Sequence, residues 1–322
     1  MQFKGLLHAT TIAAAIVFAQ QVKADPLPPG DIHFICGFAA GSGADIIVRF
    51  MSEKLRGVVG RNIIVENKPG AIGNIASEYV ARSKPDGLTI LVTGANSVAG
   101  SVHLFKNPTY DAAKAFQIAA TINRATMMLA VKNDSLYKTA QELATAMKVK
   151  GDKASYAYAN PTAKVLGALY REKAGLSSVD IAYRTGADFL NDLASGTIDY
   201  AIPDNVQAMA QLRAGRMRVL GVGAAERMKS APDIPTLTEQ GYPMDVRTWW
   251  AALVPSGTPK AAVDQINAWF GQVVDTPDAR TFSATIASDP WMTTPEEAQA
   301  YFLKDIARWG EYVKIAKIEP QG

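Results

Sequence analysis

Short apolar runs alternate with amphipathic segments along most of this chain of 322 residues. The runs at 32–38, 62–66 and 88–94 have the length and the β-branched content of strands, and the segments between them repeat apolar residues at helical spacing. Strands that alternate with helices predict a βαβαβ unit, which implies a parallel sheet covered by helices on both faces. A second series of this kind begins near Ala125 and ends with the run at 218–223.

Two such series, followed by surplus helices, predict an α/β protein with two lobes. The last two helical patterns, at 260–274 and 295–318, are expected to pack back on the first lobe. We therefore expect residues 25–124 and 226–322 to form lobe 1 and residues 125–225 to form lobe 2, each with a mostly parallel sheet flanked by helices. A chain that crosses twice between two lobes predicts a hinged clamshell with its ligand in the cleft between them.

The first 24 residues have the features of a secretory signal peptide. Lys4 supplies a positive start, residues 11–19 are apolar, and the segment ends small-x-small at 22–24, which predicts cleavage after Ala24. The alternative, a membrane anchor, is disfavoured because the apolar stretch is too short to span a bilayer. Export without a later apolar span predicts a periplasmic location.

The bulk composition is that of an ordinary globular protein, with 48% hydrophobic and 20% charged residues. Removing the leader takes away two lysines and no acidic residue, so the formal net charge falls from +3 to +1. With no dense basic run, a nucleic-acid partner is not expected. The single cysteine, Cys36, cannot form a disulfide within the chain and is expected to be a small buried side chain.

The first strand leads into a glycine-rich turn, "GFAAGSGADI", at residues 37–46. The turn lacks the Gly-Lys-Ser/Thr of a phosphate loop, the third glycine of a dinucleotide fingerprint and the G-x-S-x-G of a nucleophile elbow. It fits a capping box instead, with Ser42 as the N-cap and Asp45 three residues later. Unpaired amides at such a helix start attract anions, although a well-capped helix with no ligand explains the motif equally well.

Four other strand-to-helix turns carry small polar side chains that favour helix caps. They are 93–97, with Asn96 or Ser97 as caps; 159–164, with Asn160 before Pro161; 183–188, with Thr185 and Asp188 as a second capping box; and 202–206, with Asp204 or Asn205. The carboxyl ends of parallel strands are where open α/β sheets bind ligands. Turns from two lobes that face one another would form a pocket suited to a carboxylate.

Catalytic signals are weak in comparison. The mature chain has two histidines: His33 in an apolar strand, where a structural role is expected, and His103 in a loop. No metal-ligand spacing is present, so neither a metal nor another cofactor is expected, and the chain is not expected to be an enzyme. A secreted hydrolase that uses Ser42 with distant partners stays open as an alternative. A strand at Trp249 and Trp250 is expected to bury at least one of the two in the core, whereas Arg124, Lys164 and Arg184 are more typical of solvated surface charges.

Several segments together resemble the Bug/TctC family, the extracytoplasmic solute-binding receptors of tripartite tricarboxylate transporters. They are "GFAAGSGADIIVRFMSEKL", "IIVENKPGAIGNIASEYVARSKPDGLTILV", "AYRTGADFLNDLASGTIDYAI", "RMRVLGV", "ERMKSAPDIPTLTEQGYP" and "ALVPSGTP". The resemblance spans the mature chain in the family order. It implies a two-lobed clamshell of the type II-like periplasmic-binding-protein class that closes on a small carboxylate and delivers it to a membrane permease. A monomer is expected, and a receptor that serves a signalling sensor is an alternative that the sequence does not separate.

The resemblance also implies where the ligand binds. Residues 38–45 match the first-lobe binding loop of the family, 183–187 match the second-lobe loop, and Asp204 matches an acidic residue after a strand. With the turns above, the residues expected to bind the ligand are Phe38, Ala39, Ala40, Gly41, Ser42, Gly43, Asp45, Thr93, Asn96, Ser97, Asn160, Pro161, Thr162, Lys164, Tyr183, Arg184, Thr185, Gly186, Ala187 and Asp204.

Three departures from the family pattern leave the identity of the carboxylate open. Gly37 replaces a proline, and Asp188 stands where the family often has a proline. The segment "YANPTAK" replaces Gly-x-Gly-Ser…His, with Lys164 near the position of the histidine. The basic side chain of Lys164 leads to the hypothesis that the ligand carries a second carboxylate or is an aromatic acid.

Overall fold

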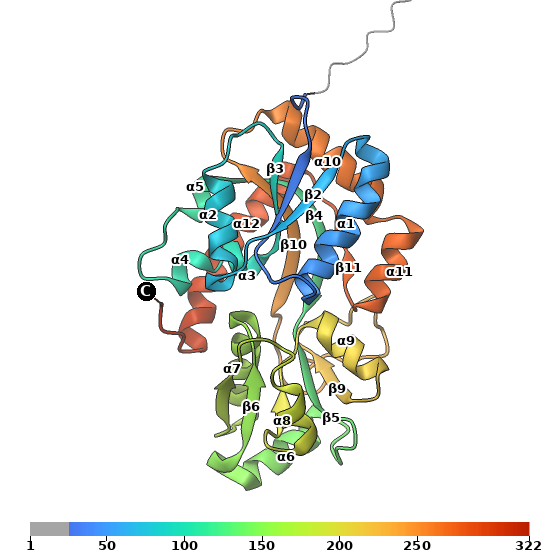
Figure 1. Ribbon diagram of the computed structural model, residues 1–322. Helices are drawn as coiled ribbons and strands as arrows, with labels where there is room; N and C mark the ends of the chain where they lie inside the picture. Colours follow the sequence, from blue (N-terminus) through green and yellow to red (C-terminus); the bar gives the residue numbers. More distant parts are fainter. Residues whose placement is uncertain (1–25, 322) are drawn as a thin grey trace, which may run out of the picture.

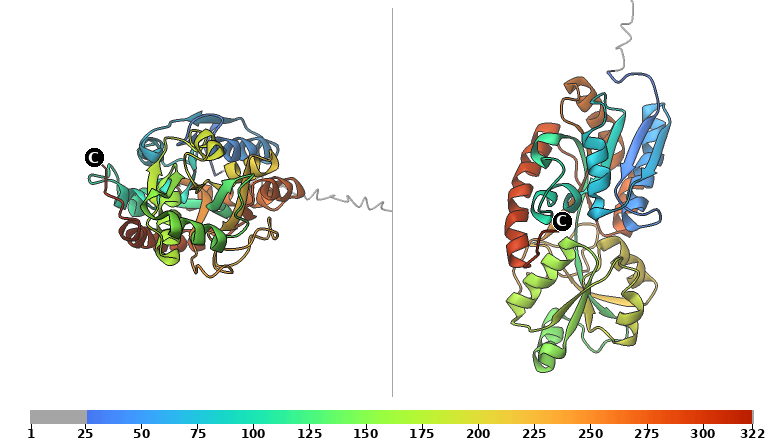
Figure 2. Two further views of the ribbon diagram at one scale, coloured as in Figure 1. Left: turned by 90° about the horizontal axis from the view of Figure 1, so that it is seen from below. Right: turned by 60° about the vertical axis from the view of Figure 1, so that its left-hand side comes forward.

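The computed structural model describes residues 26–321, so the predicted signal peptide lies outside the described residues. Figures 1 and 2 show two lobes stacked end to end, one around a six-stranded sheet and the other around a five-stranded sheet. This arrangement confirms the predicted two-lobed α/β fold. Within residues 26–321, no helix combines the length and the apolar character that a membrane span needs.

Lobe 1 contains the sheet with the order β11-β4-β10-β3-β1-β2. Its strands are β1 (Ile32–Cys36), β2 (Ile63–Asn67), β3 (Thr89–Gly94), β4 (Phe116–Thr126), β10 (Arg247–Pro255) and β11 (Asp289–Pro290). Its helices are α1 (Gly43–Val59), α2 (Asn74–Ala81), α3 (Ala95–Val98), α4 (Ser101–Leu104), α5 (Ala112–Ala115), α10 (Lys260–Val274), α11 (Pro277–Thr285) and α12 (Pro295–Ile315), with the 3₁₀ turn η1 (Ala71–Gly73).

Lobe 2 contains the sheet with the order β7-β6-β8-β5-β9. Its strands are β5 (Met128–Lys132), β6 (Ser155–Tyr158), β7 (Val179–Ala182), β8 (Tyr200–Ala201) and β9 (Met217–Val222). Its helices are α6 (Ala140–Lys150), α7 (Pro161–Ala174), α8 (Leu190–Ser195) and α9 (Asn205–Arg213), with the 3₁₀ turn η2 (Gly151–Lys153).

Alternation of side chains along β1 gives the lobe 1 sheet two buried faces. Phe34 belongs to the apolar cluster formed with α1 and α10, and its ring stacks on Phe270 with centroids 6.0 Å apart. Ile35 points to the opposite face and joins the cluster that includes α2 and α12. Cys36 is fully buried, as expected, and so is Trp249. Helices on both faces explain why the strands are almost continuously apolar.

Both sheets are mixed, whereas the alternating pattern predicts mostly parallel sheets. Strands β1, β2 and β3 are parallel to one another, but β10 runs antiparallel to both β3 and β4. In lobe 2, β6 is parallel to β7 and β8, whereas β5 is antiparallel to β8 and β9. β5 and β10 each follow a crossing between the lobes, and the short strand β11 is also antiparallel to its neighbour β4.

The lobes are joined where β4 leads into β5 and where the chain returns from β9 to β10. The amide of Gly223 donates to the Met127 carbonyl at 3.1 Å, and the amide of Val246 donates to the Gly223 carbonyl at 2.8 Å. The Thr126 hydroxyl donates to the Val246 carbonyl at 2.9 Å. The two connections are therefore hydrogen-bonded to one another at the boundary.

Near this boundary, Arg124 on β4 is not the solvated charge expected from the sequence. Its guanidinium carbon lies 3.6 Å from the ring centroid of Trp291 and 5.0 Å from that of Tyr301. Burial, together with the charges of Arg247 and Arg308, lowers the pKa of Arg124. The residue therefore fastens β4 to the aromatic side chains around α12.

The C-terminal helices follow the prediction with one addition. The helix expected at 260–274 is present with those bounds, and the helix expected at 295–318 ends at Ile315. Between them lies α11, which the sequence analysis missed, although Thr276 caps it and Pro277 occupies its first turn. Those two residues were the available signal for a helix start.

Candidate functional site

The glycine-rich turn after β1 starts helix α1, as predicted. Ser42 is the N-cap, and its hydroxyl accepts from the Asp45 amide at 3.3 Å. The Asp45 carboxylate accepts from the amide of Gly41 at 2.8 Å and not from that of Ser42, so the predicted capping box is only half formed. The side chain of Asp45 therefore folds the turn back against its own helix.

Asp45 is also the buried centre of a polar network that reaches the surface through Arg49. Its carboxylate accepts from Arg49 Nε at 2.8 Å and from Asn67 Nδ2 at 2.8 Å. Asn67 in turn donates to the Phe38 carbonyl at 3.0 Å. Burial by itself would raise the pKa of Asp45, but the hydrogen bonds from Arg49, Gly41 and Asn67 outweigh burial and lower it. The network fixes the shape of the turn at 38–45.

The structure explains why residue 37 is glycine. A Cβ at Gly37 would lie only 2.8 Å from Gly73 Cα, so no larger residue fits without moving backbone. The segment that approaches it has positive φ at Gly70, Ala71, Ile72 and Gly73, and such values in non-glycine residues cluster at functional sites. This segment after β2 thus packs against the first-lobe turn, although the sequence analysis did not place it in the site.

The turn after β3 lies beside the same segment. A Cβ at Gly73 would lie 2.9 Å from Ser97 Cβ. Ser97 was expected as a helix cap, but α3 begins before it, at Ala95, so this prediction is wrong. The Ser97 hydroxyl instead donates to the Gly94 carbonyl and contacts the Thr93 hydroxyl at 2.7 Å. Asn96 lies within α3, and its side chain is not among those the structure describes. Thr93 and Ser97 are both buried.

In lobe 2, the turn after β6 has the predicted caps. Asn160 caps α7 through a hydrogen bond from the Ala163 amide at 2.9 Å, and Pro161 is the first helical residue. Thr162 is buried, and its hydroxyl has no hydrogen-bond partner among the described residues. Lys164 lies 3.7 Å from the Asp180 carboxylate, so its charge is already paired within lobe 2.

The turn after β7 does not form the predicted second capping box. Asp188 accepts from the Thr185 amide at 2.8 Å, but α8 begins only at Leu190, with Phe189 before it. The side chain of Arg184 is 90% exposed, as expected for a solvated charge. Tyr183 donates to Asp192 at 2.6 Å, and burial together with this bond raises its pKa to about 12. Residues 184–188 are thus held by few contacts.

The turn after β8 starts helix α9. Asp204 is the N-cap, as predicted, and accepts from the Gln207 amide at 2.9 Å. Burial raises the pKa of its carboxyl, against hydrogen bonds from the amides of Gln207 and Val206 that lower it. Gln207 was not predicted to belong to the site, but a Cβ at Gly186 would fall 2.1 Å from Gln207 Oε1. This side chain therefore covers the turn at 183–187.

The turns of the two lobes meet at the boundary. A Cβ at Gly43 of lobe 1 would lie 3.0 Å from Val206 Cβ of lobe 2. Next to this contact, Asn205 Nδ2 donates to the Ile286 carbonyl of lobe 1 at 2.6 Å. The structure thus brings the predicted turns at 38–45 and 202–206 together. Figure 1 shows α9 lying beside the lower end of α1.

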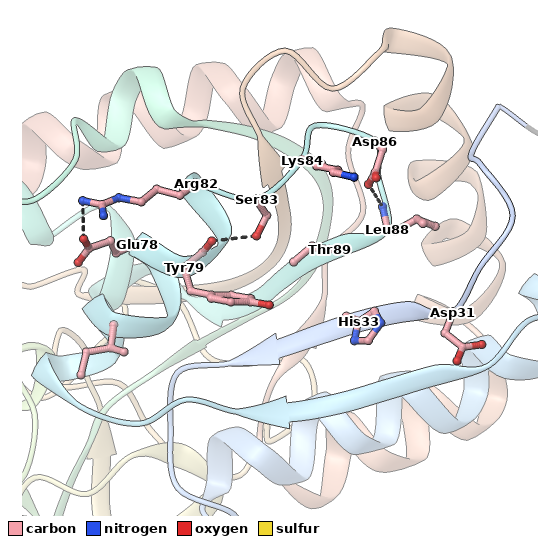
Figure 3. Close-up of a pocket in the computed structure, with 11 residues that line it drawn as sticks. Asp31, His33, Glu78, Tyr79, Arg82, Ser83, Lys84, Asp86, Leu88 and Thr89 are labelled. Carbon is pink, nitrogen blue, oxygen red and sulfur yellow. Dashed lines mark hydrogen bonds and ion pairs between the residues drawn. The ribbon is translucent and has the colours of Figure 1, made fainter.

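A separate depression of about 870 Å³ lies on lobe 1 between α2 and the strands β1 and β3 (Figure 3). His33 and Tyr79 line it, with several charged side chains that include Glu78 and Arg82. None of its lining residues belongs to the predicted ligand set. It is therefore not the site expected from the sequence.

The histidines are placed away from Ser42. His33 Nδ1 lies 2.7 Å from Glu66 Oε1, and His103, which lies in the short helix α4 and not in a loop, contacts the Ile306 carbonyl at 2.9 Å. Among residues 26–321, neither imidazole forms a hydrogen bond with Ser42, whose hydroxyl serves the helix cap. Neither described histidine is therefore placed as a general base for Ser42.

Comparison with known proteins agrees with the two-lobed fold. Residues 47–318 match the tripartite tricarboxylate transporter family receptor, TctC. A UPF0065 protein of Bordetella bronchiseptica is 27% identical over 317 residues, which cover 98% of this chain and 93% of that protein. The structure of the periplasmic binding protein BugD is 28% identical, with a TM-score of 0.80 over 91% of this chain and 100% of that chain.

A second solved structure, MatC from Rhodopseudomonas palustris with bound malate, is 25% identical. Its TM-score is 0.77, over 88% of this chain and 99% of that chain. The resemblance to the Bug/TctC family is thereby confirmed. This chain belongs to the TctC family of tripartite tricarboxylate transporter receptors.

Proposed function

We propose that this protein captures a small organic carboxylate between its two lobes and delivers it to the membrane subunits of a tripartite transporter. The observation that carries the proposal is the meeting of strand-end turns from both lobes at Gly43 and Val206. Each of these residues lies in the first turn of a helix, α1 or α9. The ligand site then occupies the turns 38–45, 93–97, 159–164, 183–187 and 202–206.

The chemistry of these turns suits an anion. The N-termini of α1, α7 and α9 carry backbone amides without partners in their own helices, and the helix dipole favours negative charge there. The buried Thr162 hydroxyl adds a group that lacks a partner among the described residues. Lys164 and Asp45 are engaged in ion pairs, so we assign binding to amides and hydroxyls, with Asp45 shaping the turn.

A binding role also fits the surroundings of Ser42 better than a hydrolase does, because neither described histidine is placed as its base. The MatC structure with bound malate supports a carboxylate as the ligand class. We further propose a periplasmic monomer released from its signal peptide after Ala24. Delivery to a sensor is the second candidate for the partner, and it leaves the ligand site unchanged.

A thermal-shift screen of the full mature chain tests the ligand class. The panel contains malate, adipate, citrate, benzoate and glutamate, with the uncharged diamide of malic acid as a matched control. A carboxylate present at 100 times its Kd stabilises the folded state by about 2.7 kcal/mol, which raises the Tm, whereas the diamide leaves it unchanged. No shift with any carboxylate would contradict the proposal. Turnover of an ester that is lost in Ser42→Ala would favour the hydrolase instead.

A further inference from the structure

The first turn of α9 connects the two lobes through consecutive side chains. Asn205 donates across the boundary to the Ile286 carbonyl, and Val206 lies against Gly43 of α1. Gln207 covers Gly186 in the turn after β7. One helical turn therefore touches both lobe 1 and the second-lobe turn that we assign to the ligand.

The close packing of Val206, and not the backbone conformation of residue 43, limits the size of the side chain that fits at Gly43. A Cβ at Gly43 would lie 3.0 Å from Val206 Cβ and 3.2 and 3.4 Å from its two methyl groups. Gly43 is the first residue of α1 and does not have positive φ, so its backbone conformation is open to other residues. Alanine stabilises a helix more than glycine does, so a glycine at this position lowers helix stability. The limited space beside Val206 gives a reason for glycine here.

We propose that Gly43 is the stop against which lobe 2 closes. Val206 reaches its place on the first turn of α1 only when the lobes are as close as in this structure, and an added methyl group at residue 43 holds them apart. This inference rests on the proposed function, because closure matters when a ligand is held between the lobes. Gly43 is then a positioning residue whose effect on affinity acts through Val206.

The test compares Gly43→Ala, Val206→Gly and the double variant, with Gly57→Ala as the matched control. Gly57 lies in the same helix, and a Cβ there would meet nothing within 4 Å. Affinity for malate and adipate is measured by calorimetry. We expect Gly43→Ala to raise the Kd about tenfold, from the usual cost of an overpacked contact. The double variant should return to within about twofold of Val206→Gly, and Gly57→Ala should match the wild type.

A second measurement does not depend on knowing the ligand. Spin labels at Glu53→Cys on α1 and Val149→Cys on α6 report the distance between the lobes, because both side chains are exposed and Cys36 is buried. We expect Gly43→Ala to remove the shortest label-to-label distances from the distribution. Adding Val206→Gly in the double variant should restore them.

The outcomes separate this inference from the proposed function. If Gly43→Ala weakens binding and Val206→Gly does not restore it, the glycine serves the ligand directly and the inference is wrong. Equal label-distance distributions in wild type and Gly43→Ala also overturn the inference. It is overturned as well if the labels in the wild type never come as close as residues 53 and 149 lie in this structure. If neither acid binds to the wild type, those two ligands fail, and the label distances still decide the inference.

Discussion

The turn after β1 in lobe 1 and the turn after β7 in lobe 2 are both assigned to the ligand, yet they are built differently. The first is held by Asp45, whose side chain is 3% exposed and accepts from Arg49, Asn67 and the Gly41 amide. The second consists mostly of exposed residues, and the hydrogen bonds across it join only Thr185 and Asp188, whose side chain accepts from the Thr185 amide and whose amide donates to the Thr185 carbonyl.

The difference indicates how the two lobes divide the work of binding. A turn whose shape is fixed before the ligand arrives loses little conformational entropy on binding, so it gives more affinity for the same contacts. A turn with few contacts can adjust to ligands of different length. We therefore expect the lobe 1 turn to bind the carboxylate group that the ligands share. The lobe 2 turn is expected to accommodate differences in the rest of the ligand.

Gly37→Ala should have the largest effect on this contrast. The new Cβ would lie 2.8 Å from Gly73 Cα, which is backbone and cannot rotate away. We expect a loss of about 3 kcal/mol in the free energy of unfolding, measured by urea denaturation. Gly271→Ala in α10 is the control, because its nearest neighbour is the flexible end of Met292 at 3.8 Å. Equal stabilities for the two variants would show that the turn is not tightly fixed.

Asp45→Asn should have the next largest effect, about 2 kcal/mol of unfolding free energy at pH 7, because it removes the charge of a buried carboxylate that accepts hydrogen bonds from Arg49, Asn67 and the Gly41 amide. The pKa of Asp45 is lowered in the folded protein, so its stabilising contribution is complete above the unfolded pKa near 3.9 and is lost as pH falls through the folded pKa. The difference between wild type and variant should therefore shrink in acid.

The matched control for this charge is Asp278→Asn, which removes an exposed partner of Lys54 on the same helix. Its effect at pH 7 should be smaller than that of Asp45→Asn. A gap between wild type and Asp45→Asn that stays constant down to pH 2 would show that the Asp45 charge does not hold the turn.

Asp188→Ala should have the smallest effect on stability, within about 0.5 kcal/mol, because its side chain is exposed. Its local effect should be clear in amide hydrogen exchange, since the Thr185 amide loses its acceptor. In the wild type, the Gly41 amide should exchange more slowly than that of Thr185. The reverse order would remove the distinction between a fixed turn and an adjustable one.

Local chemistry made the helix starts predictable from the sequence. Ser42, Asn160 and Asp204 are caps because their oxygen atoms lie next to amides a few residues away. The same reasoning gave a wrong prediction for Thr185, because its amide donates a hydrogen bond to the Asp188 carboxylate although no helix begins there. Local rules thus identified the polar turns but not which of them continue into helices.

Features that depend on distant segments could not be predicted. Gly37 is required by the backbone of Gly73, and Gly43 lies against Val206, far along the chain. Arg124 was expected to be a surface charge, but its guanidinium group packs against the ring of Trp291. The two crossings between the lobes were predicted, but the antiparallel direction of β5 and β10 was not, because the hydrophobic pattern does not encode strand direction. These relations arise only when the whole chain has packed.

The sheet of lobe 2 is formed entirely within residues 128–222, and its first and last strands are neighbours, with Met128 opposite Val222. Both ends of this insert therefore leave the parent lobe at one place. Such an arrangement lets recombination between relatives exchange the insert as a unit, because its two junctions, from β4 to β5 and from β9 to β10, lie side by side. A lineage can then keep lobe 1 and acquire a new lobe 2 as a unit, which offers a simple route to receptors with different ligands.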